Sequence, residues 1–147
     1  AKHYDLLVTL EFFPPSGISN LQQAVNIVTA AGQDNGGVNF DTWHFHRSGG
    51  QLADIEAMPK GIVTNIQISD AAGEPWSDLT DETLSGRLMP GEGCIDLPGI
   101  MRALWQADCK LPLSIEVFNE AYKSLPVSDV VQTQAQGLNA FVNSLKV

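Results

Sequence analysis

The chain has 147 residues and a mass of 15.9 kDa, with 44% hydrophobic and 17% charged residues. This composition is typical of a globular protein with one buried core, and it argues against a disordered chain. The length excludes a complete (β/α)8 barrel, because such a barrel takes roughly 250 residues. No apolar run reaches the roughly 20 residues of a transmembrane helix, so we expect no membrane span.

The charge balance is acidic, with 8 Lys and Arg against 17 Asp and Glu and a formal net charge of −9. The basic residues are scattered rather than gathered in a stripe, which argues against nucleic acid and anionic membranes as partners. Only two cysteines occur, Cys94 and Cys109, and we expect both to be free thiols in a reducing compartment. No secretory signal is visible, so the sequence predicts a cytoplasmic protein.

The first half of the chain predicts two strand–helix units. An apolar run within residues 4–13 predicts a buried strand that ends at Glu11, and Ser19 with Gln22 predicts a capping box for the following helix. A second, short strand at residues 38–40 runs into Asp41. The short helix after it stops at Pro59, because proline interrupts helical hydrogen bonding.

The second half of the chain repeats this order. A strand at residues 62–68 includes Gln67, a long polar loop covers residues 70–93, and Asp96 caps a helix. The fourth strand, at residues 111–118, reaches Glu116. Ser128 or Asp129 is expected to cap the last helix, whose apolar stripe is predicted to be Val131, Ala135, Leu138, Val142 and Leu145.

Four strand–helix units in succession favour an α/β fold with parallel strands and crossover helices, and we expect residues 1–147 to form one domain. Each predicted strand carries an oxygen-bearing side chain near its carboxyl end, where ligands bind in parallel α/β folds. A divalent metal would offset the cost of gathering three carboxylates there, and all-oxygen ligands favour Mg²⁺, Mn²⁺ or Co²⁺. The four candidates are Glu11, Asp41, Gln67 and Glu116.

Several segments around these positions resemble the xylose-isomerase-like TIM barrels, a group that includes sugar-phosphate isomerases and epimerases, inosose dehydratases and 3-dehydroshikimate dehydratases. The most specific pieces are Asp-Thr-Trp-His at residues 41–44 and Pro-Gly-Glu-Gly-Cys-Ile-Asp at residues 90–96. The resemblance runs through essentially the whole chain. It implies the C-terminal half of a (β/α)8 barrel, with four βα units. The segments that carry it are residues 10–12, 38–44, 65–70, 90–96 and 114–118.

The resemblance implies a metal held by Glu11, Asp41, Gln67 and Glu116, with zinc as a further possible ion. Many relatives carry histidine where this chain has Gln67, and glutamine there looks like the variant found among dehydroshikimate dehydratases. Glu11 and Glu116 are then expected to move a proton, with His44 as a further catalytic group in the loop after Asp41. The remaining site residue, Arg87, resembles a substrate contact, and its guanidinium suits a carboxylate or phosphate.

Three functions stay open at this point. The first is a metal-dependent isomerase or epimerase that acts on a small polyhydroxy carbonyl substrate through a metal-stabilised enediolate, and a dehydratase could use the same site. The second is an incomplete half-barrel that needs its N-terminal half or a second copy, because four strands leave two edges and an apolar inner face open. The third is a DNA-repair endonuclease, which the net charge of −9 disfavours.

Overall fold

The computed structural model describes residues 1–145 and contains one parallel four-stranded sheet. Each strand pairs with the next strand of the chain, which is the order of a barrel wall; a doubly wound sheet reverses its order at one point. The expected α/β fold with four strand–helix units is therefore confirmed. The strands are β1 (Val8–Glu11), β2 (Gly36–Asp41), β3 (Val63–Ile68) and β4 (Leu113–Ile115).

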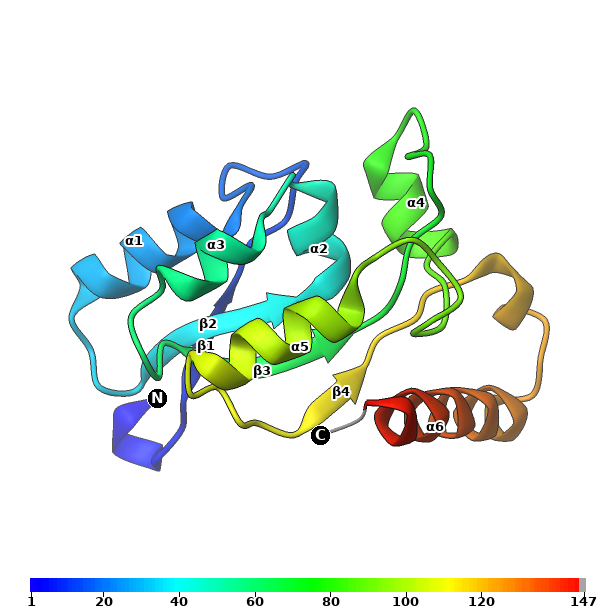
Figure 1. The fold of residues 1–147 in the computed structure, drawn as a ribbon. Helices are drawn as coiled ribbons and strands as arrows, with labels where there is room; N and C mark the ends of the chain where they lie inside the picture. Colours follow the sequence, from blue (N-terminus) through cyan, green and yellow to red (C-terminus); the bar gives the residue numbers. More distant parts are fainter. Residues whose placement is uncertain (146–147) are drawn as a thin grey trace.

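Several helices cover one face of this sheet (Figure 1). Helices α1, α3 and α5 lie along it, and α6 lies beside β4 at the end of the chain. The short helices α2 and α4 lie beyond the carboxyl ends of the strands. Their bounds are α1 (Leu21–Ala31), α2 (Thr42–Arg47), α3 (Leu52–Glu56), α4 (Leu79–Ser85), α5 (Leu97–Gln106) and α6 (Val127–Ser144), with 3-10 turns η1 (Lys2–Tyr4) and η2 (Glu120–Tyr122).

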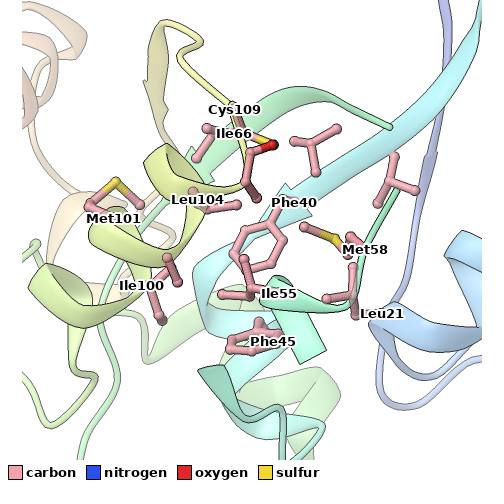
Figure 2. Close-up of a cluster of buried hydrophobic side chains, with 14 of the residues drawn as sticks. Leu21, Phe40, Phe45, Ile55, Met58, Ile66, Ile100, Met101, Leu104 and Cys109 are labelled. Carbon is pink, nitrogen blue, oxygen red and sulfur yellow. The ribbon is translucent and has the colours of Figure 1, made fainter. Parts of the chain in front are cut away.

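The hydrophobic core fills the space between the sheet and these helices (Figure 2). Phe40 of β2 and Ile66 of β3 are almost fully buried there, against Ile55 of α3 and Leu104 of α5. Because strand side chains alternate between faces, the residues next to Phe40 and Ile66 point to the opposite face of the sheet. That opposite face carries the candidate metal ligands.

The inner face of the sheet is polar, so the expectation of an apolar inner face is wrong. Leu10, Leu113 and Ile115 pack against the core on the helix side, which places their strand neighbours on the inner side. The apolar residues of each strand thus pack into the single core between the sheet and the helices. The inner residues are Thr9, Glu11, Asn39, Asp41, Asn65, Gln67, Ser114 and Glu116.

The two predicted open edges are present, at β1 and β4. The run before and into β1 is exposed rather than buried, with exposed fractions of 57% for Leu6, 62% for Leu7 and 54% for Val8. The first strand is also shorter than expected. It begins only at Val8 because η1 ends at Asp5 in a left-handed conformation with φ 54°.

Two predicted helix caps are wrong. Helix α1 is capped by Asn20, whose side chain accepts a hydrogen bond from Gln23 N, while the Gln23 side chain accepts one from Ser19 N. The box is thus shifted by one residue, because asparagine is as strong a cap as serine. Helix α6 begins at Val127, after Pro126, and has no side-chain cap, so neither Ser128 nor Asp129 fills that role.

The apolar stripe predicted for α6 is only partly correct. Leu138 and Leu145 are half-buried, and Val131, Ala135 and Val142 are exposed. The one fully buried side chain of this helix among the described residues is Phe141, which the stripe omits. The physical reason is that α6 lies at the edge of the sheet beside β4, so less than a full apolar face has a partner within the described residues.

Two short helices lie where loops were expected. The loop at residues 70–93 contains α4, which Asp78 caps through its side chain. Helix α2 follows β2 directly, because the carboxylate of Asp41 ends the strand and caps the helix. A buried ion pair joins the two helices, with Arg47 Nη2 at 2.5 Å from Glu82 Oε1. Helices of six or seven residues leave little periodic signal in a sequence.

Candidate metal centre

Four strand ends bring their oxygen-bearing side chains to one place on the inner face. Glu11 and Asp41 are the last residues of β1 and β2, Gln67 lies opposite Asp41 in the β2–β3 register, and Glu116 follows β4. Glu116 N also donates to Ile68 O at 3.1 Å, so the sheet pairing continues to this residue. The sequence thus predicted correctly that these four positions converge.

Asp41 is fully buried, and its two carboxylate oxygens accept hydrogen bonds from His44 and from Arg87. Its Oδ1 accepts a hydrogen bond from His44 N at 2.9 Å, which starts helix α2. The first turn of α2 then turns the imidazole of His44 back toward the strand ends. His44 Nε2 lies 3.6 Å from Glu11 Oε1 and 4.0 Å from Asp41 Oδ2. His44 therefore reaches the site as predicted, although from a helix rather than a loop.

Glu11, Asp41 and His44 offer ligand atoms that all lie within 4.8 Å of one another. This compact group shares two members with the predicted ligand set and adds an imidazole nitrogen. Nδ1 of the same imidazole is buried and has no hydrogen-bond partner among the described residues. The His44 ring therefore presents Nε2 to the carboxylates, while Nδ1 has no hydrogen-bond partner among the described residues.

Arg87 is the cation at the centre of this site, and it is only 2% exposed. Its Nη1 donates to Asp41 Oδ2 at 2.8 Å and to Glu116 Oε2 at 3.1 Å. The Nε and Nη2 groups donate to Thr83 Oγ1 at 3.0 and 2.6 Å. The guanidinium also lies over the rings of Trp43 and Phe118, at 5.3 and 5.6 Å from their centroids. A contact between Arg87 and a substrate anion therefore requires the guanidinium to exchange one of these partners.

Gln67 lies beside Glu116 rather than apart from it. Gln67 Nε2 donates to Glu116 Oε1 at 2.7 Å, and the amide oxygen of Gln67 accepts from Asn39. The Gln67 side chain therefore joins two of the strand ends through its amide. Sequence reasoning did not single out Asn39, because an asparagine inside a strand carries no motif of its own.

The crowding of carboxylates shifts their protonation. Burial, with the nearby charges of Asp41 and Glu116, raises the pKa of Glu11 to about 7. Burial likewise raises the pKa of Glu116, although Arg87 acts in the opposite direction. Burial lowers the pKa of His44 to about 4, so this imidazole is neutral at physiological pH. Arg87 Nη2 lies 3.2 Å from His44 Nε2, and a guanidinium only donates, so the lone pair of the neutral imidazole accepts a hydrogen bond from Arg87.

A pocket of about 310 Å³ opens above these groups. Phe13 and Phe118 contribute apolar walls, while the carboxylates and the guanidinium form its polar side. A pocket with apolar walls and a few convergent polar groups is typical of a small-molecule site. Its lining residues are Glu11, Phe13, His44, Thr83, Leu84, Arg87, Glu116 and Phe118.

A buried carboxylate shapes the loop that follows Arg87. Asp70 Oδ2 accepts hydrogen bonds from Gly91 N and Gly93 N, both at 3.0 Å, and its Oδ1 accepts from Ile95 N at 2.9 Å. A side chain at position 93 would collide with this carboxylate. The Pro-Gly-Glu-Gly motif therefore acts in part as a backbone cradle around Asp70.

The donor set suits a divalent cation. Carboxylate and amide oxygens are ligands that Mg²⁺ and Mn²⁺ prefer, and the added imidazole of His44 is compatible with Mn²⁺, Co²⁺ or Zn²⁺. The Nη1 atom of Arg87 already bridges two of the carboxylates, which shows that a positive charge is favourable at this point. The residues present therefore fit a metal.

A parallel wall of four βα units with a carboxylate-rich mouth defines half of a (β/α)8 barrel with a candidate metal site. The chain belongs to the xylose isomerase-like TIM barrel family, whose model matches residues 1–141. The family resemblance read from the sequence is thereby confirmed.

Two kinds of curated relative are similar to the chain. An inosose isomerase of Bacillus velezensis is 31% identical over 145 residues, which are 97% of this chain and 51% of that protein. A 3-dehydroshikimate dehydratase of Pseudomonas aeruginosa is 28% identical over 109 residues, which are 74% of this chain and 17% of that protein. The chain thus spans about half the length of the inosose isomerase that it matches.

Solved structures agree with this fold. The IOLI protein, solved with a binding zinc atom, superposes with a TM-score of 0.89 at 28% identity, covering 99% of this chain and 52% of that chain. A D-psicose 3-epimerase superposes with a TM-score of 0.72 at 14% identity, covering 100% of this chain and 52% of that chain, which shows the shared fold alone.

Two further expectations concern the whole chain. Among the residues that the structure describes, no helix combines the length and apolarity that crossing a bilayer requires. Both cysteines are free thiols as expected, with Cys94 exposed and Cys109 buried.

Proposed function

We propose that this chain supplies the metal-binding half of a divalent-metal-dependent isomerase that acts on an inosose-like polyhydroxy carbonyl compound. The observation that carries the proposal is the convergence of Glu11, Asp41, Gln67 and Glu116 at four successive strand ends. These four residues are the proposed metal ligands. The similarity to inosose isomerases supports this choice of substrate class.

The bound metal would polarise the substrate carbonyl and stabilise the negative charge that develops on its oxygen. Glu11 and Glu116 lie at the rim of the pocket, where a carboxylate can take a proton from one carbon and return it to the next. His44 is neutral and close to Glu11, so its Nε2 can accept a proton from a substrate hydroxyl once it gives up its contact with Arg87 Nη2. Arg87 fixes the orientation of Asp41 and Glu116.

The test is turnover of an inosose in deuterated buffer, followed by NMR, with and without chelation of metal. We expect exchange of the hydrogen next to the carbonyl only in the metal-loaded protein, and a loss of at least a hundredfold in Glu116→Gln. Activity that survives chelation, or that survives in Glu116→Gln, would refute the proposal. Arg102→Met is the matched control, because Arg102 is exposed on α5.

A dehydratase is the second candidate, and Gln67 is the observation that favours it, together with the similarity to 3-dehydroshikimate dehydratases. In that reaction the enolate expels a hydroxyl group, and His44 is the proposed base. Mass spectrometry separates the two candidates, because dehydration removes one water from the product and isomerisation leaves the mass unchanged.

We further propose that the chain acts as one unit that needs the rest of a barrel wall, from an N-terminal half or from a second copy. The open edges at β1 and β4 and the exposed Leu6 and Leu7 support this proposal. Light scattering after size exclusion tests it for this chain: a dimer or larger assembly is expected, and a well-behaved monomer would count against the proposal.

A further inference from the structure

Five inner-face side chains form an unbroken chain of hydrogen bonds beneath the carboxylates. Three of them are amides, and all three donate in the same direction, toward Glu116. The bonds run from Ser114 Oγ to Asn65 Oδ1 (3.2 Å), from Asn65 Nδ2 to Asn39 Oδ1 (2.8 Å), from Asn39 Nδ2 to Gln67 Oε1, and from Gln67 Nε2 to Glu116 Oε1 (2.7 Å). The register pairs Asn39 with Asn65 and Gln67 with Ser114, which brings these groups within reach.

The Glu116 carboxylate sets the direction in which the hydrogen bonds of this chain run. An ionised carboxylate only accepts hydrogen bonds, so Gln67 must face Glu116 with its amide nitrogen. The Gln67 oxygen then faces Asn39, which must in turn present its own nitrogen. Asn39 is only 7% exposed, so water does not offer its amide an easy alternative. In this state the Gln67 oxygen, the atom that a metal would need, is directed to Asn39.

The same chain can run in the opposite direction with every hydrogen bond between its amides and Ser114 replaced by its reverse. A half-turn of an amide exchanges its donor and its acceptor in place. Gln67 Nε2 then donates to Asn39 Oδ1, Asn39 Nδ2 to Asn65 Oδ1, and Asn65 Nδ2 to the Ser114 hydroxyl. A hydroxyl accepts as readily as it donates, and the carbonyl oxygen of Ile66 lies 3.3 Å from Ser114 Oγ to receive its proton.

We propose that Asn39, Asn65 and Ser114 are positioning residues that allow the Gln67 amide to reverse when a divalent cation binds. Without the cation, the Gln67 nitrogen faces Glu116; with it, the Gln67 oxygen faces the carboxylates. Within the chain every other amide keeps a donor and an acceptor in both states, so the bonds lost are those that Gln67 makes to Glu116 and that Asn39 makes to Glu11. This inference rests on the proposed function, because it takes Gln67 as a metal ligand.

The experiment is calorimetric titration of the purified protein with Mn²⁺. The variant Asn39→Leu removes both the donor and the acceptor next to Gln67, and we expect its affinity for Mn²⁺ to fall by about 10- to 100-fold, as for other residues that orient a ligand. Ser114→Ala removes the exposed end of the chain and is expected to give a smaller loss in the same direction. Thr9→Val is the matched control, because Thr9 is an inner-face residue outside the chain of hydrogen bonds.

A second readout follows the amides themselves. On addition of Mg²⁺, the side-chain NH₂ resonances of Gln67, Asn39 and Asn65 are expected to shift together in NMR spectra, with assignments taken from single variants. Thermal unfolding of Asn39→Leu checks that this variant is folded. If it is not, the Mn²⁺ affinity of Ser114→Ala decides the test.

Two results would overturn the inference while leaving the proposed function intact. The first is that Asn39→Leu and Ser114→Ala both bind Mn²⁺ as tightly as the control variant Thr9→Val. The other is an Mg²⁺-dependent shift confined to Gln67. If the unaltered protein binds neither ion, the proposed function fails and the inference fails with it.

Discussion

The guanidinium Nη1 of Arg87 lies 2.8 Å from Oδ2 of Asp41, and both side chains are almost completely shielded from solvent. The same nitrogen lies 3.1 Å from Glu116 Oε2. The pair thus places a fixed positive charge where the strand ends converge, and it offsets part of the cost of burying the carboxylates. It therefore affects both the stability of the fold and the affinity of the proposed metal site.

Replacing Arg87 with methionine is expected to strengthen metal binding and to weaken turnover. The guanidinium competes with a metal for Asp41 and Glu116, and one charge pair at ~4 Å with an effective dielectric of ~20 is worth about 4 kcal/mol. We expect Arg87→Met to bind Mn²⁺ at least about tenfold more tightly in calorimetry. Arg102→Met is the control, and weaker binding in Arg87→Met would show that the guanidinium supports the metal instead.

The variant Asp41→Asn is expected to destabilise the protein strongly. Asparagine can still cap α2, but it leaves the buried guanidinium of Arg87 with only the partly exposed Glu116 as a charged partner. Breaking a buried ion pair typically costs about 3–5 kcal/mol. Urea denaturation monitored by circular dichroism measures this loss. Asp54→Asn, at an exposed position in α3, is the control, and equal stability of the two variants would contradict the prediction.

Metal affinity is expected to rise with pH until about pH 7. Glu11 has a pKa of about 7 in the folded protein without metal, against an ordinary value of 4.5, so a metal must displace its proton at lower pH. The apparent Mn²⁺ affinity should increase by up to about tenfold per pH unit below 7 and then level off. In Glu11→Gln this slope should be lost, and a slope that persists there would assign it to another group.

The same pKa predicts an opposite trend for stability in the protein without metal. Between pH 4.5 and 7 the folded protein holds a proton on Glu11 that the unfolded chain has released, so its free energy of unfolding falls as pH rises. Saturating Mn²⁺ should remove this trend, because Glu11 then carries no proton in either the folded protein or the unfolded chain. Thermal unfolding across that pH range, with and without Mn²⁺, measures both effects, and a stability that rises with pH without metal would contradict them.

The glycine at position 93 is expected to be sensitive to the smallest change. In Gly93→Ala the new methyl group would meet the Asp70 carboxylate and the Ala71 carbonyl, and overpacking of this kind typically costs about 1–3 kcal/mol. Gly73→Ala in the same loop meets nothing within 4 Å, so its stability should stay equal or rise by less than about 1 kcal/mol. Equal thermal midpoints for the two variants would contradict the prediction and show that the loop backbone shifts to accommodate the new methyl group.

Much of the fold could be predicted from local patterns. The β-branched run before Gln67 and the apolar residues before Glu116 form strands, and Asp96 caps α5 through Gly99 N as expected. Parallel strands bring their carboxyl ends to one edge, so the convergence of the ligand candidates followed from their place in the sequence. The caps did not: α1 begins one residue later, at Asn20, because neighbouring residues are equally competent caps, and α6 begins after Pro126 with no side-chain cap.

The sequence by itself determined four strand–helix units, the positions of the oxygen ligands and the family, because these depend on short-range hydrophobic periodicity and on spacing along the chain. Only the tertiary structure decided that Arg87 is buried between Asp41 and Glu116, that Asn39 links Gln67 to Asn65, and that the inner face is polar. These features join residues separated by 26 to 46 positions, and their geometry depends on the register of strands that pair far apart in sequence.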